Sequence, residues 1–296
     1  MPVSRPYAPH EYLVAEARPY PEIWRLLTGL IVVTAVVVAM NAVLFIVVAS
    51  LGPPQWVAEF LIGATPVSLL VVLSSFAFTT LGVALAARHL QHRTLRSIIG
   101  ERSATFRQFW RVLGALTLLG AVLLALPPYG MGAALQPNLA WSSWLPLLPL
   151  SLTAVLIQTS AEEILFRGYF QQSLAARFRS PLIWMGVPSV LFALGHYAPA
   201  LAGDNAVLVT LWACIFGLLT ADLTARSGTL GPAIALHFFN NASALLVISV
   251  PDSLSGLALY HLPYTMSDTG IVRQWLYVDF ALMIIGWLTV RLALRR

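Results

Sequence analysis

Three groups of polar side chains interrupt apolar stretches in the second half of this 296-residue chain. The groups comprise Glu162, Glu163, Arg167, Phe192, His196, His237 and Asn241. A carboxylate with a histidine can activate water, while a second histidine and an asparagine can donate hydrogen bonds to an oxyanion. Together these side chains meet the chemical requirements for hydrolysing an amide without a covalent nucleophile.

Helical spacing assigns different roles to the two adjacent glutamates. Glu163 and Arg167 are four residues apart, so on a helix they lie about 40° from each other and are predicted to pair. Glu162 lies about 140° around the helix from Arg167, which leaves it without a local counter-ion. The spacing therefore predicts a structural pair and a free acid that is available as a general base.

The other two groups repeat the four-residue spacing. Phe192 shares a helix face with His196, and His237 shares one with Asn241. Glutamate with two histidines could also bind zinc. However, the sequence contains no His-Glu-x-x-His segment, and asparagine is an unusual zinc ligand. We expect no cofactor, and zinc remains an open alternative.

The composition indicates the kind of element that carries these residues. Only 10% of the chain is charged and 58% is hydrophobic, whereas a soluble domain carries roughly a quarter charged residues. This excludes a soluble enzyme and a disordered chain, and it predicts an all-α, polytopic membrane bundle of about eight transmembrane helices. The predicted spans are about 24–50, 57–87, 110–127, 144–173, 182–198, 206–224, 231–250 and 274–292. Residues 1–23 are predicted to be a cytoplasmic tail without a fold of its own, before a single transmembrane domain over 24–296.

The arginines predict the orientation. With the N-terminus in the cytoplasm, all of the 17 basic residues except Arg273 fall in cytoplasmic segments or near them. We therefore expect an integral protein of a bacterial cytoplasmic membrane with both termini inside. The net charge of +5 then reflects topology and not a nucleic-acid partner. The expected partners are the lipid bilayer and a membrane-associated substrate, and the sequence indicates no particular oligomeric state.

The three groups, in this order, resemble the CAAX prenyl protease and bacteriocin-processing family of intramembrane proteases, also called the Abi family. Its pattern is Glu-Glu-x-x-x-Arg, Phe-x-x-x-His and His-x-x-x-Asn on successive membrane helices, and the resemblance covers about residues 145–250. It implies a protease-like core over this region. It also implies that Glu162 and His196 activate the attacking water and that His237 and Asn241 stabilise the oxyanion.

The same resemblance implies supporting roles for three residues. Glu163 and Arg167 would hold the site in shape, and Phe192 would pack beside it. The substrate would be a membrane-associated peptide or protein, cleaved by an endopeptidase of the glutamate type.

Two other functions remain open at this point. Intramembrane carboxylates and histidines could relay protons in a transporter, or the chain could be a catalytically silent immunity or scaffold protein. A transporter would favour repeat symmetry between its halves, but the polar groups lie in one half only. A silent member would be expected to have lost a motif residue, and all are present, so the sequence favours the protease.

Overall fold

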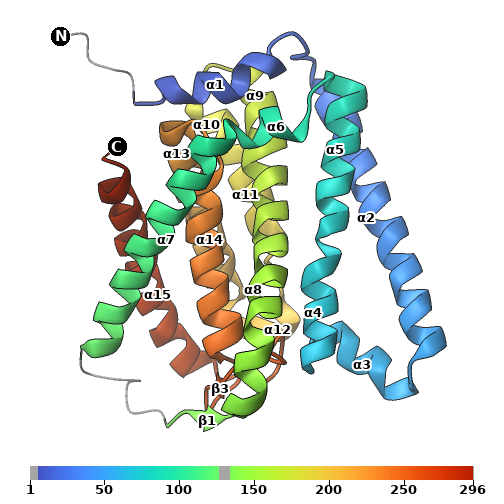
Figure 1. Ribbon diagram of the computed structural model, residues 1–296, viewed down its shortest axis with the longest axis vertical. Coiled ribbons are helices and arrows are strands. Elements are labelled where there is room, and N and C mark those ends of the chain that lie inside the picture. Colours follow the sequence, from blue (N-terminus) through green and yellow to red (C-terminus); the bar gives the residue numbers. More distant parts are fainter. Residues whose placement is uncertain (1–5, 127–133, 296) are drawn as a thin grey trace.

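The computed structural model describes residues 6–126 and 134–295, which are almost entirely helical (Figure 1). The first half contains η1 (Ala8–His10), α1 (Glu11–Val14), η2 (Ala15–Ala17), α2 (Ile23–Leu51), α3 (Pro54–Ile62), α4 (Pro66–Ser75), α5 (Ala77–Gln91), α6 (Leu95–Ile99) and α7 (Arg102–Ala125). The second half contains α8 (Trp141–Glu163), η4 (Ile164–Phe170), α9 (Gln171–Arg177), α10 (Pro181–Trp184), α11 (Gly186–Leu194), α12 (Pro199–Ala202), η5 (Gly203–Asn205), α13 (Ala206–Ser227), α14 (Gly231–Ala242), η6 (Ser243–Val247) and α15 (Thr269–Leu294). Two-residue strands β1 (Gln136–Pro137), β3 (Tyr260–His261) and β2 (Ile248–Ser249) pair in that order, β1 antiparallel and β2 parallel to β3.

Six helical stretches in the described part of the chain are long and apolar enough to cross a membrane. They are Ile23–Leu51, Pro66–Gln91, Arg102–Ala125, Trp141–Arg177, Pro199–Ser227 and Thr269–Leu294. The helical membrane bundle is confirmed, but the predicted count of eight spans is not. The predicted span 182–198 is a shorter helix, Pro181–Leu194, because the chain leaves the helix before Pro199. The predicted span 231–250 becomes α14 and η6, which end at β2.

The prediction that residues 1–23 have no fold of their own is wrong for residues 8–17. These residues form three short helices that lie across one end of the bundle (Figure 1), and Leu13 is buried there. Arg93 Nη2 donates to the Leu13 carbonyl at 3.2 Å, and Tyr7 Oη donates to Asp222 Oδ1 at 2.9 Å. A hydropathy pattern detects long apolar runs, so it overlooked these short segments.

The two helices that carry most of the polar groups, α8 and α14, pack against each other at the centre of the bundle. At the start of α14 a Cβ on Gly231 would lie 2.4 Å from the Thr105 carbonyl oxygen, so α14 approaches α7 closely only because this residue is glycine. Directly after Glu163, α8 continues as η4, a π-helical segment. Such segments are frequent at functional sites because they re-aim the side chains around them.

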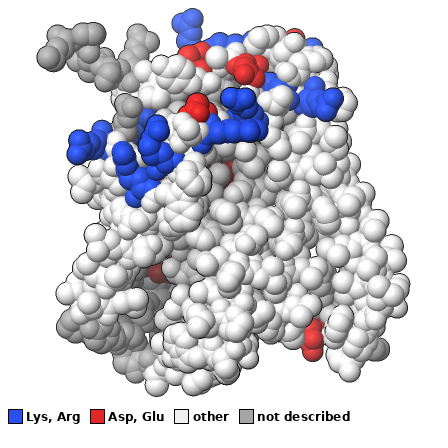
Figure 2. All heavy atoms as spheres, viewed as in Figure 1, with Lys and Arg blue, Asp and Glu red and all other residues white. Residues whose placement is uncertain are grey.

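The charged side chains are segregated along the long axis. On the face shown in Figure 2 the basic side chains gather at the upper end, where Figure 1 places the N-terminal helices, α6 and the first turns of α7. The end of α15 lies at this same end of the bundle. At the other end, Arg273 donates to Asn205 Oδ1 at 3.0 Å. Together with the six apolar spans, this segregation describes an integral membrane protein, and the side of the membrane that each end faces stays a prediction.

Candidate active site

The predicted pair of Glu163 and Arg167 is confirmed. Arg167 Nη1 donates to Glu163 Oε1 at 3.1 Å, and both side chains are buried. The guanidinium carbon of Arg167 also lies 4.7 Å from the centroid of the Phe192 ring, a favourable cation–π distance. The pair therefore anchors η4 to α11 as well as to the end of α8.

His237 of α14 lies between the two glutamates. Its Nδ1 is 2.8 Å from Glu163 Oε1, and its Nε2 is 3.4 Å from Glu162 Oε2. A carboxylate can only accept a hydrogen bond, so Nδ1 carries a proton that it donates to Glu163. This bridge could not be predicted from spacing within one helix, because it depends on the packing of α8 against α14.

The charges of this cluster balance with one further proton. Glu162 and Glu163 contribute two negative charges and Arg167 one positive charge. An unbalanced charge is costly in an apolar bundle, and a proton on His237 Nε2 would offset the second negative charge across the 3.4 Å to Glu162 Oε2. Glu162 is 16% exposed, whereas Glu163 is 0% exposed, so Glu162 is the carboxylate that a substrate or water can reach.

Phe192 of α11 lies between the two histidines. Its ring centroid is 4.5 Å from that of His196 and 6.1 Å from that of His237. His196 is exposed, and its Nδ1 is 2.9 Å from the Phe192 carbonyl oxygen. Nδ1 must therefore carry the proton, which leaves a lone pair on Nε2. In the described chain no hydrogen bond joins His196 to Glu162, so the two predicted water-activating residues are not in direct contact.

Asn241 bonds to a residue that the sequence reading missed. Its Nδ2 donates to Gln158 Oε1 at 2.9 Å, and Asn240 Nδ2 donates to Asn241 Oδ1 at 3.1 Å. Gln158 lies four residues before Glu162 on α8. A polar residue one turn from the glutamate, in an apolar run, was the signal that could have identified it.

An aromatic wall completes the site. Phe216 of α13 lies 5.1 Å from the His237 ring and 6.4 Å from the Phe192 ring, and it stacks on Trp212 at 5.2 Å, all between centroids. Sequence reasoning missed Phe216, because it does not differ from other apolar residues of its helix. His237 is buried beside these rings, and such a low-dielectric surrounding strengthens its polar contacts.

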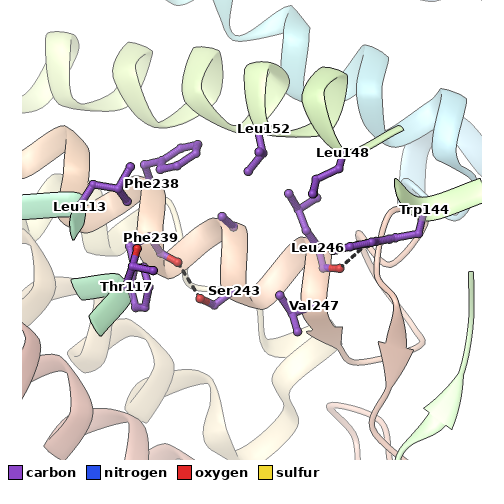
Figure 3. Close-up of a pocket in the computed structure, with 11 residues that line it drawn as sticks. Leu113, Thr117, Trp144, Leu148, Leu152, Phe238, Phe239, Ser243, Leu246 and Val247 are labelled. Carbon is purple, nitrogen blue, oxygen red and sulfur yellow. Dashed lines mark hydrogen bonds between the residues drawn. The ribbon is translucent and has the colours of Figure 1, made fainter. Parts of the chain in front are cut away.

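The cavity in Figure 3 is separate from this cluster. It measures about 300 Å³ and lies between α7, α8 and α14. Its lining is apolar apart from Thr117, Ser243 and the Trp144 indole nitrogen, which already donates to the Leu246 carbonyl at 2.8 Å. None of the seven predicted site residues lines it, so it is not part of the candidate site.

The arrangement does not fit the zinc alternative. Within the described ranges, no three His, Cys, Asp or Glu side chains are arranged to hold a metal ion. His237 Nδ1 is already engaged with Glu163 Oε1 at 2.8 Å, so this nitrogen is not available as a ligand. No step of the chemistry below is assigned to a metal.

Comparison with known proteins places this region in a family. Residues 142–243, which hold all seven predicted site residues, match the family model described as type II CAAX prenyl endopeptidase Rce1-like. The chain is also 25% identical over 247 residues to the uncharacterized protein YyaK of Bacillus subtilis (strain 168), covering 79% of this chain and 81% of that protein. No solved structure matches. The resemblance is thus confirmed over residues 142–243, which match the Rce1-like model of type II CAAX prenyl endopeptidases.

Proposed function

We propose that this protein is an intramembrane endopeptidase that hydrolyses a peptide bond in a membrane-associated peptide or protein. One observation carries the proposal: the partly exposed Glu162 lies 3.4 Å from His237, beside the buried pair of Glu163 and Arg167. A carboxylate beside a histidine can accept a proton from water and release it again. The Rce1-like domain supports the same class of activity.

In the hydrolytic step, the accessible polar side chains act on the water molecule and the buried ones hold them in place. Glu162 accepts a proton from water as the water oxygen bonds to the scissile carbonyl carbon. The lone pair on His196 Nε2 accepts a hydrogen bond from the second water hydrogen, which stays on the oxygen, and so orients the attack. When the carbon–nitrogen bond breaks, the proton held by Glu162 passes to the leaving amine, so atoms and charges balance.

The developing oxyanion needs hydrogen-bond donors. One Nδ2 hydrogen of Asn241 is used by Gln158, and the other is available to the oxyanion. His237 Nε2, at 3.4 Å from Glu162, can donate to the oxyanion once Glu162 has taken the proton of water. Glu163 holds His237 in this orientation through Nδ1.

Proteolysis by the purified protein in detergent or liposomes tests the proposal. Glu162→Ala and His196→Ala are each expected to abolish cleavage while the protein stays folded. Glu59→Ala is the control, because this acid lies on α3, outside the Rce1-like domain. Cleavage by both site variants would overturn the assignment. A folded wild-type protein that never cleaves would instead favour the catalytically silent immunity or scaffold function.

Metal dependence is tested separately. We expect activity to survive a chelator and elemental analysis to find no stoichiometric zinc. Activity that a chelator removes and zinc restores would contradict direct use of glutamate.

The substrate is to be identified without assumptions about its sequence. Membrane peptides from cells with the wild-type protein are compared with those from cells carrying Glu162→Ala. A peptide that is shortened only with the wild type is the expected result, and identical peptide sets would count against the proposed function.

A further inference from the structure

The side chain of Gln158 faces the same direction as Glu162, one helical turn away. The two residues are four apart on α8, and Gln158 is only 6% exposed. A carboxamide buried among apolar helices is costly unless both of its ends have partners. The partners of Gln158 therefore indicate what it does.

A chain of amides fixes which end of Gln158 is free. Asn240 Nδ2 donates to Asn241 Oδ1 at 3.1 Å, and Asn241 Nδ2 donates to Gln158 Oε1 at 2.9 Å. An amide oxygen accepts and an amide nitrogen donates, so each bond sets the orientation of the next group. Gln158 consequently presents its Nε2 away from Asn241, and this nitrogen donates to no residue in the described part of the chain.

We propose that Gln158 is a substrate-binding residue whose Nε2 donates a hydrogen bond to a backbone carbonyl oxygen of the bound peptide, next to the scissile bond. This inference rests on the proposed endopeptidase function. One helical turn rises about 5.4 Å, and an extended peptide advances about 3.3 Å per residue. The carbonyl that Gln158 reaches is therefore a neighbour of the one attacked beside Glu162.

The structure separates this role from simple helix-to-helix attachment. If Gln158 only attached α8 to α14, the hydrogen bond from Asn241 to its Oε1 would be enough. A buried carboxamide with one unpaired end costs more free energy than an apolar side chain at the same place. A free donor beside the accessible glutamate suits an acceptor that arrives with the substrate. Because all peptides carry backbone carbonyls, this contact confers affinity without sequence preference.

A binding measurement that needs no turnover tests the inference. The probe is fluorescein-labelled casein, an unfolded protein, and its affinity is measured by fluorescence anisotropy in detergent. Glu162→Ala is compared with Glu162→Ala/Gln158→Met, where methionine keeps the length and removes the amide. Loss of one hydrogen bond is expected to weaken binding about 3- to 10-fold.

The matched control is Thr159→Val in the same Glu162→Ala background. Thr159 is the next residue on α8 and is fully buried, but its hydroxyl donates to the Val155 carbonyl at 2.9 Å within the helix. We expect no change in affinity. Should Gln158→Met fail to fold, Gln158→Asn replaces it, because the shorter amide withdraws the donor.

Each outcome decides the inference. The inference is overturned if Glu162→Ala and Glu162→Ala/Gln158→Met bind casein with equal affinity. It is also overturned if neither of them binds casein. In the active protein, Gln158→Met should raise KM, since the contact exists already in the bound substrate; an unchanged KM also overturns it. If cleavage requires Glu162 but is unchanged by Gln158→Met, only this inference is refuted. Gln158-dependent binding without any cleavage refutes only the endopeptidase.

Discussion

Glu163 receives hydrogen bonds from two helices at once. Its Oε1 lies 3.1 Å from Arg167 Nη1 and 2.8 Å from His237 Nδ1. The first contact could be predicted because spacing within one helix fixes it. The second could not, because it depends on how α8 and α14 pack. For the same reason the sequence predicted that Glu162 is free but not that it faces His237.

Breaking the buried pair from one side is expected to destabilise the protein. Arg167→Leu leaves Glu163 charged without its cation, which costs about 3–5 kcal/mol in buried pairs. The measurement is the thermal unfolding midpoint in detergent. Glu163→Gln/Arg167→Leu removes both charges and should unfold at a higher temperature than Arg167→Leu. A double variant that is no more stable than the single one would contradict the pairing.

At the scale of elements, the sequence predicted where the helices lie better than how they end. All eight apolar runs contain helix, but the run over 182–198 stops at Leu194 and the run over 231–250 passes into η6 and β2. Helices end here at proline, at glycine or in a π-helical segment, and a hydropathy pattern does not detect these features. The N-terminal helices were missed because their burial depends on surfaces of α9 and α13, distant in sequence.

Docking of the N-terminal helices is expected to depend on pH. Burial against Trp184 and Gln171 lowers the pKa of His10 from 6.5 to about 4. The neutral form is the docked one, so docking is complete above pH 6.5 and weakens as pH falls from 6.5 towards 4. The nearby Glu11 has a pKa lowered from its ordinary value, mainly by its hydrogen bond with Arg18.

Hydrogen exchange of residues 8–17 between pH 4 and pH 8 measures this dependence, after correction for intrinsic exchange rates. His10→Gln should remove the pH-dependent loss of protection, and the exposed His89→Gln should not. Protection that stays constant to pH 4 in the wild type would show that His10 does not control docking.

At the scale of the molecule, the arginines at one end of the bundle predict its orientation (Figure 2). Replacing Cys214 with serine removes the one native thiol. Ser103→Cys at the start of α7 and Ser267→Cys before α15 then place exposed thiols in the segments predicted to be cytoplasmic and external. An impermeant maleimide added outside intact cells should label only Ser267→Cys. Labelling of Ser103→Cys alone would reverse the topology.

The proposed hydrolysis depends most on Glu162 as the group that accepts the proton of water. The direct measurement is the cleavage rate of Glu162→Gln against wild type in ¹⁸O-labelled water, with the peptide found in the membrane comparison. The glutamine keeps the shape but cannot accept a proton, so the rate should fall by at least about 100-fold. With the wild type, the fragment that ends in the new carboxyl group should gain one ¹⁸O. A Glu162→Gln protein that cleaves at the wild-type rate would contradict the account.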